Sequence, residues 1–238
     1  MQRFVASTIF AMGLAATAAH AQHVHGGDVE VEIEEGRIVT HGARVFEAEF
    51  DAGTAATDEP GFDSEAGTFN SGASVTLSLL SDLEAWNGSA FVAPGSVGTN
   101  SVAEILHVYQ ATAASPNNIN TLSGPTSLTT TANASGTWHK HFAFTLFPQT
   151  GDDPAGLGPD GQDPDAGIYR IALGLSTNQS GVDSSLPFWI VFNYNDSEFN
   201  HEAAVDFTNA EVAAVPEPAA MGLAALLAPL VLRRVRRA

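Results

Sequence analysis

Histidine is the residue type in this 238-residue chain with the clearest capacity for chemistry. Two pairs, His23 with His25 and His139 with His141, each have a single residue between their members. On a β-strand, residues i and i+2 point to the same face, so each pair can present two imidazoles to one point. Neutral imidazole nitrogen is a common metal ligand. The spacing therefore predicts a metal site.

The absence of cysteine restricts the ligands of such a site. Thiolate metal sites, iron–sulfur clusters, disulfides and a cysteine nucleophile are excluded. Imidazole and carboxylate ligands favour zinc and admit manganese or copper. The candidate ligands are five histidines and one aspartate: His23, His25, Asp28, His139, His141 and His201. In this hypothesis the second pair binds the ion, one N-terminal histidine joins it, and His201 or Asp28 is a fourth ligand.

Other chemistry has weaker support in the sequence. Asp160, Asp163 and Asp165 crowd carboxylates into one segment, but the spacing is not that of an EF-hand and Pro164 stiffens it, so we favour a solvated acidic loop over a calcium site. The chain has no G-x-S-x-G elbow, P-loop or H-E-x-x-H motif, so we expect a protein that is not an enzyme. Its many carboxylates leave a glycosidase pair open.

The elements that must position these side chains are predicted to be strands. Polar and apolar residues alternate in many short segments, with glycine, proline and asparagine between them. The predicted strands are residues 28–34, 37–40, 44–50, 74–80, 104–111, 127–131, 137–147, 167–176, 187–194 and 203–208. Helical periodicity is suggested only around residues 77–86. The predicted fold class is all-β, a single β-sandwich of jelly-roll or immunoglobulin-like type, with a hairpin turn at Glu35-Gly36.

The predicted strand 137–147 separates the histidines from the core. Phe142, Phe144 and Leu146 share one face of this strand, and His139 and His141 lie on the other. The site should therefore lie outside the main hydrophobic core. The predicted core draws on Val31, Phe46, Phe50, Leu79, Phe142, Phe144, Ile171 and Ile190.

The two ends of the chain are predicted to direct its location. Residues 1–21 combine Arg3, an apolar run and the small-x-small pattern Ala19-His20-Ala21, which is typical of a secretory signal peptide with a signal helix. Residues 22–212 form the β-sandwich domain. Residues 213–238 contain Pro216-Glu217-Pro218, an apolar helix at residues 219–232 and four arginines. This apolar run is short for a stable transmembrane helix, and an uncleaved tail anchor is the alternative interpretation.

The net charge of the exported part restricts the kinds of partner that it can bind. Between Gln22 and Val215 there are four basic and 26 acidic residues, which leaves a formal charge of −22. Such a surface favours solubility and attracts cations. It argues against nucleic acid as a partner, because phosphate binding needs clustered lysine and arginine.

The tail resembles the PEP-CTERM sorting signal of bacterial exported proteins, which an exosortase recognises and removes. The rest resembles the zinc-repressor-regulated PEP-CTERM proteins and related HxH surface-anchored proteins. The motifs that carry this resemblance are His25-Gly26-Gly27-Asp28, Asp58-Glu59-Pro60-Gly61-Phe62, His139-Lys140-His141-Phe142-Ala143-Phe144 and Gly167-Ile168-Tyr169-Arg170-Ile171. His139 and His141 match the HxH motif, and the early histidine of the family corresponds to His23 or His25.

The resemblance implies an exported protein that is connected with zinc or manganese supply. It would lie in the periplasm, at the cell surface or in the extracellular matrix. Its partners would be the exosortase and secretion machinery, the membrane through its tail before processing, and extracellular polysaccharide. Three functions stay open from the sequence: a noncatalytic metal-binding domain, a structural or adhesive matrix protein without a metal site, and an exported hydrolase.

Overall fold

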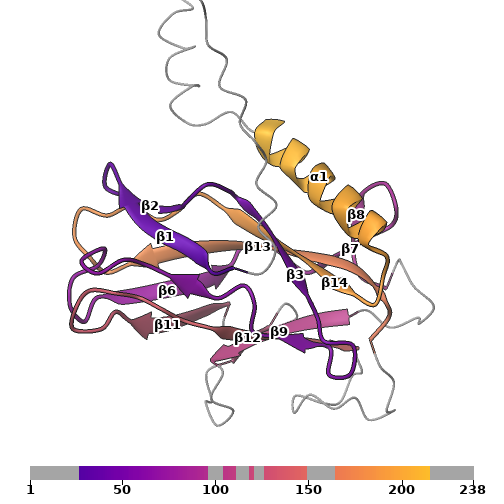
Figure 1. Cartoon of the computed structure of the whole chain (residues 1–238), viewed down its shortest axis with the longest axis horizontal. Helices are drawn as coiled ribbons and strands as arrows, with labels where there is room; N and C mark the ends of the chain where they lie inside the picture. The colour runs from indigo at the N-terminus through magenta and orange to yellow at the C-terminus, as the bar shows by residue number, and fades with distance from the viewer. Residues whose placement is uncertain (1–26, 96–103, 111–117, 121–125, 149–163, 215–238) are drawn as a thin grey trace, which may run out of the picture.

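The computed structural model describes residues 27–95, 104–110, 118–120, 126–148 and 164–214. This part of the chain is mostly β-sheet, with 46% of residues in strands and one helix (Figure 1). The elements are β1 (Val29–Glu34), β2 (Arg37–Thr40), β3 (Val45–Glu49), β4 (Ala56–Thr57), β5 (Phe62–Asp63), β6 (Ser74–Leu79), β7 (Glu84–Trp86), β8 (Phe91–Val92), β9 (Glu104–Gln110), β10 (Asn118–Asn120), β11 (Ser127–Thr131), β12 (Phe142–Pro148), β13 (Gly167–Thr177), β14 (Phe188–Tyr194) and α1 (Glu198–Ala214). The predicted signal peptide, the Pro216-Glu217-Pro218 tail, and both Asp160 and Asp163 lie outside the described residues.

The strands form three sheets. A seven-stranded sheet has the order β11-β6-β13-β14-β3, and β7 and β8 extend it beside β13. A four-stranded sheet has the order β10-β9-β12-β4, and a three-stranded sheet has the order β2-β1-β5. Among the described pairs, β14 with β3 and β1 with β5 are parallel, and the others are antiparallel. The β1–β2 hairpin turns at Glu35 and Gly36, whose φ angles of 48° and 79° suit the tight turn predicted there.

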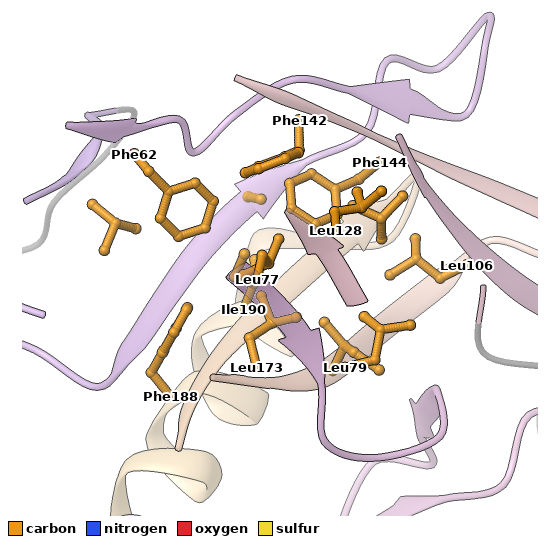
Figure 2. Packing of buried hydrophobic residues seen from close by; sticks show 14 of the residues in the cluster. Phe62, Leu77, Leu79, Leu106, Leu128, Phe142, Phe144, Leu173, Phe188 and Ile190 are labelled. Carbon is orange, nitrogen blue, oxygen red and sulfur yellow. The ribbon is translucent and has the colours of Figure 1, made fainter. Parts of the chain in front are cut away.

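Side chains from these sheets enclose one large hydrophobic core, as Figure 2 shows. Phe142 and Phe144 on β12 meet Leu173 on β13 and Ile190 on β14, and all four are fully buried. The predicted core is confirmed except at Phe46, which is partly buried and packs edge-on against Phe188. Sheets that face each other across such a core are consistent with a β-sandwich.

The predicted strand at residues 203–208 is wrong, because these residues lie in the middle of α1. The buried residues of α1 have the spacing i, i+3, i+4 and i+7 of a helix face: His201, Ala204, Val205 and Thr208. Two of these four are polar and one is small, so the face carries little hydrophobic signal. Ser197 caps the first turn, where its Oγ accepts a hydrogen bond from the backbone N–H of Asn200 at 3.3 Å. Residues 77–86, where the sequence suggests a helical period, contain the end of β6 and the whole of β7 instead.

Helix α1 covers the outer face of the seven-stranded sheet. Its Ala204 and Val205 join a second hydrophobic cluster with Val45, Ile168 and Val191. Because β13 is covered on both faces, all of its residues from 168 to 175 are buried. The helix crosses the predicted domain boundary at residue 212 and ends at Ala214. Within the described part of the chain, no helix combines the length and apolar character needed to span a membrane.

Candidate metal centre

Three chain segments meet at the position of the His-x-His motif. Lys140 forms an isolated antiparallel bridge with Phe62, in which each backbone N–H donates to the other residue's carbonyl at 2.8 Å. Beside it, the Val29 N–H donates to the Gly61 carbonyl at 2.7 Å. The predicted strand 137–147 is therefore too long, since β12 begins only at Phe142. Residues 138–141 are instead held by β5, which is two residues long and offers little further pairing.

The bridge places His139 and His141 on the same side of the segment, as the predicted strand would have done. The two imidazole rings lie on one side of Lys140, with their centroids 5.0 Å apart. Their side chains are 53% and 30% exposed, whereas Trp138 and Phe142 on either side are fully buried. The histidines therefore lie at the surface above the core.

Asp28 brings a carboxylate between the two imidazoles. Its Oδ2 lies 3.5 Å from Nδ1 of His139, and its Oδ1 lies 3.7 Å from Nε2 of His141. Asp63 adds a second carboxylate, with Oδ1 3.2 Å from the same Nδ1 of His139. Donor atoms around a tetrahedral zinc ion, at about 2.0–2.1 Å from the metal, are separated by about 3.3–3.4 Å. These three nitrogen–oxygen distances are close to that separation, and one donor atom from each of Asp28, His139 and His141 lies within 4.8 Å of the others.

The other ring nitrogen of His141 contacts the backbone. Its Nδ1 lies 3.2 Å from the carbonyl oxygen of Asp58. A carbonyl only accepts hydrogen bonds, so Nδ1 carries the hydrogen, and in the neutral ring the lone pair is on Nε2, which faces Asp28. Metal-ligating histidines commonly donate their second ring N–H to a backbone carbonyl in this way.

Gly61 leaves room for the Asp28 carboxylate and the His141 ring. A Cβ atom at this position would collide with Oδ1 of Asp28 and lie 2.6 Å from Cε1 of His141. Any other residue would therefore push the donor atoms apart. The position belongs to the segment Asp58-Glu59-Pro60-Gly61-Phe62 that the sequence singled out.

Buried aromatic residues support the site from below. The ring of Phe62 packs against Trp138 and Phe142, with centroids 5.7 Å and 5.8 Å away. Trp138 is also held by two hydrogen bonds of 2.7 Å, from its backbone N–H to Oγ of Ser64 and from its indole N–H to Oγ1 of Thr130. Side chains that rest on such a packed base hold their geometry without a ligand.

The sequence missed two carboxylates of this site. Asp63 contacts His139, and Oε1 of Glu59 lies 3.8 Å from Nδ1 of His141. Both are more than 70 residues from the histidines in the chain, and the β1–β5 pairing and the Lys140 bridge bring them together. The only sequence signal was their place in or next to the Asp58-Glu59-Pro60-Gly61-Phe62 segment.

The remaining candidate ligands lie elsewhere. His201 is on α1, in a separate group with Glu47 and Glu198, so Asp28 is the predicted fourth ligand that accompanies His139 and His141. His23 and His25 lie outside the described residues. His107, which is not among the candidate ligands, is buried in β9 against Phe147, and burial lowers the pKa of its imidazole.

Asp28, His139 and His141 form a group of donors that could hold a metal ion at the surface, and Asp63 lies beside His139. Imidazole nitrogens together with carboxylate oxygens are a donor set that suits borderline metals such as zinc. Comparison with protein-family models and with curated proteins finds no match for this chain.

Proposed function

We propose that this protein is an exported, noncatalytic β domain that binds zinc or a similar divalent ion through Asp28, Asp63, His139 and His141. The observation that carries the proposal is the spacing of the donor atoms, 3.2–3.7 Å between imidazole nitrogens and carboxylate oxygens. Zinc is favoured because it accepts nitrogen and oxygen ligands together in a tetrahedral site. Manganese and copper are the competing ions to be compared with it.

The surroundings of the site favour a cation. The two segments that flank the histidines carry four carboxylates: Asp28, Asp58, Glu59 and Asp63. Against these acidic side chains, the His-x-His motif itself contributes one basic side chain, that of Lys140. The formal charge of −22 between Gln22 and Val215 adds a long-range attraction for cations. An ion bound here would offset carboxylate repulsion within the site.

Export is the second part of the proposal. Residues 1–21 act as a signal peptide, and residues 213–238 act as a PEP-CTERM tail that an exosortase removes after transient membrane anchoring. The domain between them is a single β-sandwich that is retained in the periplasm, at the cell surface or in the matrix. Mass spectrometry of protein from its own host should find an N-terminus near Gln22 and no apolar tail. Retention of Met1 on most molecules would contradict export.

Calorimetry on untagged protein tests metal binding directly. The double variant His139→Ala/His141→Ala should bind Zn²⁺ at this site at least ~100-fold more weakly, because it loses both nitrogen donors. His41→Ala is the control at a different group of donors, in which His41 lies with Glu30 and Glu32 and its Nδ1 faces Glu32 at 3.5 Å. This control should bind as the unchanged protein does. Equal zinc affinity in the double variant and the control would overturn the proposal.

The role of Asp63 is tested by a single substitution. Asp63→Asn keeps the shape of the side chain and removes its charge, and we expect affinity for Zn²⁺ to fall about tenfold. Asp82→Asn, at an exposed aspartate, makes the same change in net charge and should have little effect. If both variants lose affinity equally, net charge rather than ligation by Asp63 explains the loss.

A further inference from the structure

A second group of donors lies between α1 and the edge strand β3. Glu198 and His201 are three residues apart in the first turns of α1, and so share one face of the helix. Glu47 and Glu49 are two residues apart on β3 and share one face of the strand. Helix α1 packs on β14 and β3 (Figure 1), which brings the two faces together. One donor atom from each of Glu47, Glu198 and His201 lies within 4.8 Å of the others.

The hydrogen bond of His201 determines which nitrogen faces the carboxylates. The residue is only 2% exposed, and its Nε2 lies 3.0 Å from the carbonyl oxygen of Val191. Nε2 must therefore carry a hydrogen, which leaves the lone pair of the neutral ring on Nδ1. That atom lies 3.3 Å from Oε1 of Glu49. A lone pair and a carboxylate repel each other, so a cation, either a proton or a metal ion, is needed between them.

Glu49 is itself held in place. The side-chain amide of Asn193 donates to its Oε1 at 3.2 Å, from the neighbouring strand β14. The imidazole is likewise fixed by its contact with Val191, as metal-ligating histidines usually are through their second nitrogen. His201 is buried, Glu47 is half-buried and Glu198 is exposed, so an ion could enter from solvent and meet Nδ1 of the imidazole.

We propose that His201, Glu47 and Glu198 bind a second divalent metal ion, with Glu49 as a further oxygen ligand, and that this ion ties the first turn of α1 to β3. One nitrogen and several carboxylate oxygens make a harder ligand set than that of the zinc site, so Mn²⁺ is the expected ion. This second site shares no residue with Asp28, Asp63, His139 and His141, and it stands independently of the proposed zinc function.

Titration of Mn²⁺ into the His139→Ala/His141→Ala variant tests the second site alone. Electron paramagnetic resonance of free Mn²⁺ should show one equivalent bound. Adding Glu47→Gln/Glu198→Gln should weaken this binding at least ~30-fold. The matched control Glu34→Gln/Glu202→Gln changes two exposed glutamates outside the group and should leave Mn²⁺ binding intact. No uptake, or an equal loss in the control, would overturn the proposal.

Nuclear magnetic resonance of the His201 ring distinguishes a metal ion bound to Nδ1 from a proton on the same atom. Addition of diamagnetic Zn²⁺ at saturating concentration should shift the Nδ1 resonance while the Nε2 hydrogen remains bonded to Val191. If the ring is instead an imidazolium paired with Glu49, both nitrogens keep their hydrogens and their shifts do not respond to metal, which contradicts the proposal. Because zinc binding at His139 and His141 is measured in the Glu47→Gln/Glu198→Gln variant, failure of one site is distinguishable from failure of the other.

Discussion

The two proposed metal sites differ in how their donors are brought together. At the bridge between Lys140 and Phe62, one exposed and one half-buried imidazole come from one short segment, and the carboxylates come from β5 and from the residue before β1. Under α1, one buried imidazole meets carboxylates from a strand and from its own helix. The first group takes two nitrogen donors from one local segment, whereas the second has a single nitrogen donor and exists only because α1 packs on β3. Local spacing and tertiary packing are thus separate routes to a candidate metal site.

The largest expected effect comes from filling the first site without removing a ligand. Gly61→Ala should weaken Zn²⁺ binding at least ~100-fold, because its Cβ would collide with Asp28 and crowd His141. Binding of Mn²⁺ between α1 and β3 should not change. Calorimetry with each ion measures both effects. Gly53→Ala is the control, since a Cβ there meets a single atom at 3.4 Å, an ordinary contact. Unchanged zinc affinity in Gly61→Ala would place the ion elsewhere.

The next largest effect is expected from a substitution under α1, which should weaken only the metal site formed by Glu47, Glu198 and His201. Arg170 is buried under α1, donates to Glu84 at 2.8 Å, contacts Glu211, and lies 4.1 Å over the Phe91 ring. Arg170→Met should lower the free energy of unfolding by about 2–3 kcal/mol, because it leaves carboxylates unpaired at a packed interface.

Urea denaturation measures this loss of stability, and metal titration completes the comparison. In Arg170→Met, Mn²⁺ should bind more weakly and Zn²⁺ should bind as before, because α1 carries no ligand of the first group. Arg37→Met is the control. It removes an exposed ion pair with Asp183 at 3.8 Å, which should contribute less than about 1 kcal/mol. A smaller loss in Arg170→Met than in the control would contradict the role of Arg170 in docking α1.

The pH dependence of metal affinity should differ between the two sites, because they contain different numbers of imidazoles. Metal binding requires neutral imidazole, so each ligating histidine that is protonated in the free protein must release a proton. Log K for Zn²⁺, whose group contains two imidazoles, should therefore fall more steeply with acid than log K for Mn²⁺, whose group contains one. Titrations at a series of pH values measure both slopes. Equal slopes would mean that the groups use the same number of histidines.

The smallest expected effect concerns His107, a histidine outside both proposed sites whose pKa is lowered by burial. Burial lowers the pKa of His107 in the folded state below that in the unfolded chain. Its contribution to stability is therefore complete above the unfolded pKa, about 6.5, and is lost as pH falls through the folded pKa. Thermal unfolding of His107→Leu between pH 7 and 5 should show a weaker loss of stability with acid, by about 1 kcal/mol or less. A steeper loss in the variant would contradict this assignment.

Alternation of polar and apolar residues predicted much of the sheet structure. Arg37–Thr40 and Ser127–Thr131 have the bounds that were predicted for them, because a period of two is a local property. Helix α1 escaped prediction because its buried face consists of histidine, alanine, valine and threonine rather than large apolar residues. What makes that face suitable is the sheet beneath it, which no local pattern records.

The sequence alone determined that His139 and His141 would lie together above the core, because one intervening residue in an extended segment places both on one side. It also determined that carboxylates, not thiolates, would complete any metal site. Only the tertiary structure decided which carboxylates these are. Asp63 meets His139 because β5 pairs with β1 and Phe62 bridges to Lys140, and His201 meets Glu49 because α1 docks on β14 and β3. Contacts between residues far apart in the chain depend on how the sheets and the helix pack, and short-range spacing carries no record of that packing.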